Sequence, residues 1–114
     1  MKKYIVLYHA SPDSWDPSAQ TSEEDMKKGM EQWMIWAEKC GEHLLDMGNP
    51  LGSALKILPG GKTEQGNPET LGYSILQANN MDHARDLIKD HPHLDWNATC
   101  EITLHETMQT PGSE

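Results

Sequence analysis

Basic residues are scarce in this chain. Its 114 residues include nine Lys and Arg against 18 Asp and Glu, which gives a net charge of −9 at neutral pH. Proteins that bind nucleic acid need a basic surface for the phosphates, and an anionic membrane surface repels a chain of this charge. We therefore predict neither nucleic acid nor a membrane among the partners.

Long apolar runs are missing as well. The apolar part of "MKKYIVLYHA" stops after Tyr8, which is shorter than the core of a signal peptide, and no apolar stretch of about 18 residues occurs. Cysteine occurs only at Cys40 and Cys100, too few for a disulfide framework. The sequence thus predicts a cytoplasmic protein with reduced thiols.

The remaining pattern indicates one α+β domain over 1–107, followed by a polar tail at 108–114. Thr21 and Glu24 have the spacing of a capping box at the start of the first helix. We predict four strands and two helices: strands at 3–8, 51–58, 71–78 and 98–105, a helix at 22–46, and a second helix that begins after Asn80 and ends before Pro92.

The resulting order, β-α-β-β-α-β, is the ferredoxin-like arrangement. Two helices cover one face of a four-stranded sheet, yet "KYIVLY" (3–8) is apolar on both faces. We therefore expect a homodimer in which the uncovered sheet faces pack against each other.

The stretch "DHPHLDW" (90–96) is the first candidate for a functional site. In the expected topology it precedes the last strand and lies near His9, at the end of the first strand. Glu101 starts the polar side of the last strand, and Trp15 and Trp96 lie on loops at the same edge. The glycine-rich connection at 59–70 is expected to cover this edge.

Each histidine has more than one interpretation. An imidazole beside a carboxylate is suited to acid/base chemistry. His91 is equally explained as a partly protonated residue at the end of a helix, and His9 as a solvent-facing strand end. His93 follows Pro92 in extended chain and has no comparable structural role.

A bound metal is the weaker interpretation of the same stretch. His91 and His93 supply two ligands at most, and a site needs three or four. The stripe of Met26, Met30 and Met34 is interpreted as helix core rather than a soft-metal site, because no Cys or His shares its spacing. We predict no metal and no cofactor.

The sequence resembles the YCII-related family, and within it the DGPF-domain-like branch. The matching parts include "GNPLG" (48–52), "GY" (72–73), "HPHL" (91–94) and Glu101. The resemblance implies a ferredoxin-like fold that pairs as a dimeric α+β barrel. Some members are presumed enzymes with a His–Asp pair in a cleft, and some DGPF relatives are associated with sigma factors.

This chain departs from the family pattern at two places. The first helix reads "MEQWMIW" (30–36), without the histidine that some members carry there. The namesake Asp-Gly-Pro-Phe run is absent, and the chain has no Phe. Among the family's recurring polar positions, His93 and Glu101 match.

Two functions follow as expectations. In the first, a polar cleft binds a small metabolite and acts on it, with His93 as general acid/base, Glu101 as its orienting partner, and His91 and His9 assisting. Tyr73 lines that cleft. In the second, the same edge is a non-catalytic ligand-sensing or protein-interaction module, with Trp15 and Trp96 as aromatic anchors.

Overall fold

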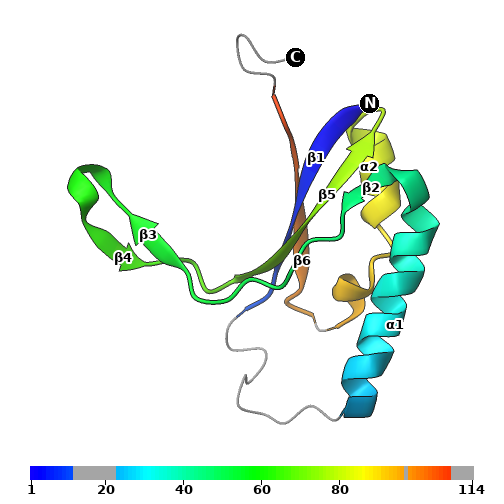
Figure 1. Ribbon diagram of the computed structural model, residues 1–114, viewed down its shortest axis with the longest axis horizontal. Helices are drawn as coiled ribbons and strands as arrows, with labels where there is room; N and C mark the ends of the chain where they lie inside the picture. Colours follow the sequence, from blue (N-terminus) through cyan, green and yellow to red (C-terminus); the bar gives the residue numbers. More distant parts are fainter. Residues whose placement is uncertain (12–22, 97, 109–114) are drawn as a thin grey trace.

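The computed structural model describes residues 1–11, 23–96 and 98–108. A four-stranded antiparallel sheet has the order β2-β5-β1-β6, and both helices lie on one side of it (Figure 1). The sheet strands are β1 (Lys2–His9), β2 (Leu44–Asp46), β5 (Thr70–Ala78) and β6 (Glu101–Glu106), and the helices are α1 (Glu23–Cys40) and α2 (Met81–Ile88). These six elements follow each other as β-α-β-β-α-β, so the predicted α+β fold with a ferredoxin-like order is confirmed.

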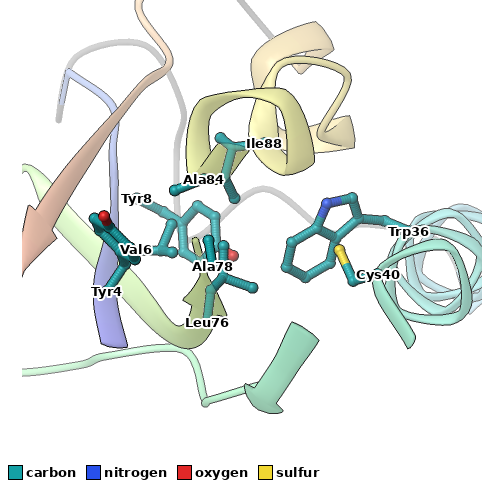
Figure 2. Packing of buried hydrophobic residues seen from close by; sticks show 9 residues of the cluster. All are labelled: Tyr4, Val6, Tyr8, Trp36, Cys40, Leu76, Ala78, Ala84 and Ile88. Carbon is teal, nitrogen blue, oxygen red and sulfur yellow. The ribbon is translucent and has the colours of Figure 1, made fainter. Parts of the chain in front are cut away.

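The core lies between the sheet and the two helices. Alternation along β1 places Tyr4, Val6 and Tyr8 on this side, where each is almost fully buried. The cluster is completed by β5, α1 and α2 residues that point toward the same centre (Figure 2): Leu76, Ala78, Trp36, Cys40, Ala84 and Ile88. Burial of this cluster holds both helices on one face of the sheet.

The first helix is shorter than predicted. It ends at Cys40, because Gly41 adopts a positive φ of 56° that L side chains rarely adopt. A short 3-10 turn at Gly41–His43 then leads directly into β2 at Leu44–Asp46. The prediction that the helix runs to residue 46 was wrong, since Leu44 belongs to the sheet instead.

The predicted strand at 51–58 was also wrong about its place in the sheet. Only Leu55–Ile57 form a strand, β3, and it pairs with β4 (Thr63–Gln65) in a separate two-stranded hairpin. The turn between them is built on Gly60 and Gly61, both at φ 87°. Figure 1 shows this hairpin projecting from the body, on the side of the sheet away from the helices, so it does not cover the edge near His9.

The second helix begins as predicted. Asn80 is its N-cap, and the side-chain Oδ1 accepts a hydrogen bond of 2.8 Å from the backbone N–H of His83. After the helix ends at Ile88, Pro92 opens a short 3-10 turn, η4 (Pro92–Asp95), rather than only a loop. This turn packs against α1; His91 is its N-cap and His93 is part of it.

The methionine stripe of α1 is not helix core, contrary to the prediction. Met26 and Met30 are 63% and 60% exposed, whereas Trp36 and Cys40 near the other end of the helix are buried. The first half of α1 therefore extends past the sheet, and Figure 1 shows its lower turns beyond the strands. Met34 is also 49% exposed, so the core contact of α1 is made by Trp36 and Cys40 rather than by the predicted methionines.

Several predictions fall outside the described residues. These are Trp15, the capping residue Thr21, and nearly all of the polar tail at 108–114, of which the structure describes only Met108. Among the residues that the structure does describe, no helix is both long and apolar enough to cross a membrane.

Candidate functional site

A cleft of about 780 Å³ opens beside the overhanging half of α1. One wall is the α1 face that consists of Met26, Gly29, Met30, Gln32 and Trp33. Opposite it lie the chain at 47–50 and the start of β5 at 71–73, and the end is closed by Tyr8 and the η4 turn. This volume is typical of sites for small molecules.

His93 lies at the inner end of this cleft and is only 7% exposed. Its Nε2 donates to the backbone carbonyl of His9 at 2.8 Å. Burial lowers the pKa of His93, which outweighs the hydrogen bonds to the backbone of His9 and Glu101 that raise it. A neutral ring with its proton on Nε2 has an unprotonated Nδ1, so His93 carries a basic nitrogen at neutral pH.

His91 holds the η4 turn in place. It is the N-cap of that turn, and its Nδ1 accepts a hydrogen bond of 2.9 Å from the backbone N–H of His93. The ring is fully buried among the rings of Tyr8, Trp33 and Trp36, with centroids 4.8, 4.4 and 4.3 Å away. The geometry gives His91 a role in positioning His93.

Burial also decides the protonation of His91. It lowers the pKa of His91 to about 3, with a smaller contribution from the neighbouring His93. The interpretation of His91 as a partly protonated residue at a helix end was therefore wrong. Because Nδ1 is an acceptor, the neutral ring carries its proton on Nε2, which has no hydrogen-bond partner among the described residues.

Tyr8 connects the cleft to the sheet. Its hydroxyl lies 2.7 Å from Ser74 Oγ, which in turn donates to the carbonyl of Met47 at 2.7 Å. Since Ser74 uses its proton on that carbonyl, the Tyr8 hydroxyl is the donor to Ser74. Burial raises the pKa of Tyr8 to about 12, so this side chain is a fixed donor and not a base.

The chain at 46–50 lies directly on β5. Gly48 has φ 78°, and a Cβ on it would be 1.7 Å from the carbonyl oxygen of Tyr73. Its N–H bonds to Asp46 Oδ1 at 2.8 Å, and Pro50 forms an isolated bridge with Gly72. Only glycine permits this approach, which puts one side of the cleft in place.

The structure separates the side chains of Glu101 and His93. Glu101 is exposed and pairs in register with His9, one position from the buried Tyr8–Ile102 pair, so its side chain is on the other face of the sheet. Only its backbone interacts with His93. The predicted orientation of His93 by the Glu101 carboxylate was therefore wrong, since alternation along β6 directs that carboxylate away from the cleft.

The backbone and the side chain of His9 make contacts on different faces of the sheet. Its carbonyl accepts the His93 bond, but its own ring lies 2.9 Å from Thr103 Oγ1 and 3.3 Å from Thr70 Oγ1 on the open face of the sheet. The half-exposed Trp96 belongs to the cleft wall. Tyr73 borders the cleft with its part of β5, but alternation along β5 directs its side chain to the open face with Leu7, so the prediction that the Tyr73 side chain lines the cleft was wrong. The predicted approach of the segment at 91–93 to the end of β1 is confirmed.

Sequence reasoning missed Tyr8, Ser74 and Trp33 as parts of this site. Strand alternation provided a signal for Tyr8, because it shares the core face with Tyr4 and Val6. Nothing in the sequence indicated that Trp33 would contact His91. In the described ranges, no group of three or more His, Cys, Asp or Glu is arranged to hold a metal ion.

No family model matches this chain, and a search of curated proteins finds no significant relative. The resemblance to the YCII-related family therefore stays a prediction.

Proposed function

We propose that the cleft binds a small metabolite and acts on it by acid/base chemistry, with His93 as the group that exchanges the proton. The observation that carries this proposal is the state of His93. It is a nearly buried, neutral imidazole on a cleft wall, and its Nε2–H is fixed on the His9 carbonyl. A lowered pKa keeps this positioned imidazole unprotonated at neutral pH, so its free nitrogen is available as a base.

The groups around His93 support it without reacting themselves. His91 fixes the backbone of the turn, and the His9 carbonyl fixes the tautomer of the ring. The buried Tyr8 hydroxyl is held by Ser74 at the same end of the cleft. In this mechanism the backbone of β1 takes the orienting role that the sequence had assigned to the Glu101 carboxylate.

The test compares His93→Gln with the wild type. Glutamine keeps an N–H for the His9 carbonyl but has no basic nitrogen. A panel of metabolites is screened by thermal unfolding, where a ligand at 100 times its Kd adds about 2.7 kcal/mol to the stability of the native state. We expect hits to be converted by the wild type and to be bound but left unchanged by His93→Gln, as followed by mass spectrometry.

The alternative is a non-catalytic ligand-sensing or protein-interaction module, of the kind associated with sigma factors. The half-exposed indole of Trp96 on the rim favours it, because exposed aromatic anchors are typical of binding surfaces. A ligand that stabilises the wild type and is recovered unchanged after prolonged incubation supports this alternative and contradicts the acid/base role.

We further propose that the protein is a cytoplasmic homodimer of the YCII-related, DGPF-like type, paired as an α+β barrel. On the open face of the sheet Ile5 is paired with Ile75, and Leu7 with Tyr73, in adjacent positions. This apolar patch has no cover among the described residues of one chain. The hairpin beside it exposes Leu55 and Ile57 by 66% and 70%, and a second copy provides a surface for both.

Sedimentation of the wild type and of Ile75→Glu tests this assembly. We expect a dimer for the wild type and a monomer for Ile75→Glu, because a charge in the middle of an apolar interface has no partner. Ile35→Glu is the matched control, since Ile35 is exposed on α1 rather than on the sheet. A wild type that is monomeric at micromolar concentration contradicts the proposal.

A further inference from the structure

The cleft wall is rich in aromatic rings and thioethers. Trp33 comes from α1 and Trp96 follows η4, while Met26, Met30 and Met47 contribute flexible, polarisable side chains. Flat apolar molecules gain most from such a surface, because indole faces stack on rings and methionine adapts to their edges. The wall thus favours a ring-containing ligand over a sugar or another strongly hydrated molecule.

The charge of the wall is one-sided. All nine Lys and Arg lie among the described residues, and none of them belongs to the wall. Among the described residues of the wall Asp95 is the one carboxylate, and His93 on the same wall is neutral. Outside the wall, the acids Glu23, Glu24 and Asp25 of the first turn of α1 are largely balanced by Lys27 and Lys28, so the charge preference of the cleft rests on Asp95.

From these two observations we infer that the ligand is a single flat, apolar or aromatic ring system that carries no negative charge and has one hydrogen-bond donor for His93. Phosphate and carboxylate ligands find no cation in this cleft, and they meet the charge of Asp95 instead. A cavity of about 780 Å³ accommodates one such molecule. The inference rests on the proposed function, because it concerns the same cleft.

Three probes of nearly equal shape test the charge preference. Indole-3-acetamide is neutral, tryptamine is a cation and indole-3-acetate is an anion at pH 7.5. Their affinities for the wild-type protein are measured by isothermal titration calorimetry. We expect the amide and the amine to bind and the acetate to bind about fivefold more weakly, because Asp95 is an exposed like charge on the same wall and two unit charges 4 Å apart in water repel by about 1 kcal/mol.

Asp95→Asn should reduce the difference in affinity between the amide and the acetate. It should raise the affinity for the acetate and leave the affinity for the amide unchanged. Asp95 is exposed, so the variant is expected to fold. Asp86→Asn is the matched control, because it removes one negative charge from α2 outside this cleft. The control should preserve this difference.

Three results would overturn the inference: an acetate that binds as tightly as the amide, a difference that Asp95→Asn leaves intact, or no binding of any probe at millimolar concentration. The proposed function fails separately. If the amide binds with the expected charge preference and His93→Gln converts a screened metabolite as fast as the wild type, the ligand class stands and the acid/base role of His93 does not.

Discussion

The two faces of the central sheet are made of neighbouring residues that have different surroundings. Val6 is fully buried under the helices, whereas Ile5, one position earlier on β1, is 37% exposed on the open face. The covered face also contains the buried polar side chains of His91, His93 and Ser74. Apolar character alone therefore does not reveal which face is the core; the elements that pack on it decide.

The comparison also separates two kinds of histidine. His91 and His93, under the helices, are neutral and fixed by hydrogen bonds to the backbone. His9 and His105, on the open face, lie beside Thr103 and Ile5 in adjacent positions of the sheet. Burial lowers the pKa of both His91 and His93.

Gly48→Ala should cause the largest loss of stability, because Gly48 packs directly on β5 beside the cleft. The new Cβ would overlap the Tyr73 carbonyl, in addition to the cost of a positive φ. We expect more than about 4 kcal/mol of destabilisation or failure to fold. Gly60→Ala is the control in urea unfolding, since it shares the positive φ but has open space, and should lose only about 1–2 kcal/mol.

Leu76→Ala and Ile75→Ala test the two faces on a single strand. Leu76 is fully buried in the core, so its truncation should cost about 2–5 kcal/mol in the free energy of unfolding. Ile75 lies on the open face, and its truncation should cost less than about 1 kcal/mol in the isolated chain. In the proposed homodimer the effect of Ile75→Ala should appear as weaker association. Equal losses in a monomer would contradict the distinction between the faces.

The buried His91 should make stability fall with acid. Its pKa is about 3 in the folded protein, below the ordinary value of 6.5 that the unfolded chain has. Between these values the unfolded state binds a proton that the folded state does not, so the contribution is complete above pH 6.5 and is lost as pH falls toward 3. The slope should rise to about 1.4 kcal/mol per pH unit below about pH 5.5, as measured by urea unfolding at pH 7, 6, 5 and 4.

His91→Phe separates this effect from other titrating groups. Phenylalanine keeps a ring of similar size but has no proton to bind, so the slope should decrease by about 1.4 kcal/mol per pH unit. His93, whose pKa is also lowered, retains its smaller contribution in the variant. An unchanged slope would show that His91 is not a neutral buried group.

Tyr8→Phe should have the smallest of these effects. It removes the hydroxyl that donates to Ser74, while Ser74 keeps its own bond to the Met47 carbonyl. We expect a loss of about 1 kcal/mol in the free energy of unfolding. Tyr73→Phe, on the open face of the same sheet, should change stability by less than about 0.5 kcal/mol.

Local signals predicted much of the fold. These signals are the apolar run at 3–8, the Asn80 cap and the helix stop before Pro92. Each depends on neighbouring residues, and the structure has β1 and α2 at these places. The errors came where tertiary contacts override the local pattern. Leu44 and Leu45 continue a helical spacing, yet the chain turns at Gly41 so that Leu44 pairs with β5.

The site was predictable only in its outline. The topology predicted that the segment at 91–93 lies near the end of β1. This segment precedes β6, and the start of β6 lies beside the end of β1 because the two strands are antiparallel neighbours. The topology did not reveal that the contact uses the His9 carbonyl rather than the ring, or that the Glu101 side chain faces the other way. A difference of one residue in a strand reverses the side on which a side chain lies.

The sequence by itself determined the first and last strands, the third predicted strand (β5) and both helices in outline, because hydrophobic spacing, caps and turn residues act over a few positions. It also determined the net charge of −9, on which the prediction of no nucleic-acid partner rests. Only the tertiary structure decided which apolar face of the sheet is covered. It also decided where α1 extends past the sheet and forms a cleft, and that burial keeps His91 and His93 neutral. Those properties depend on burial, and burial is created by residues distant in sequence that meet only when the chain has folded.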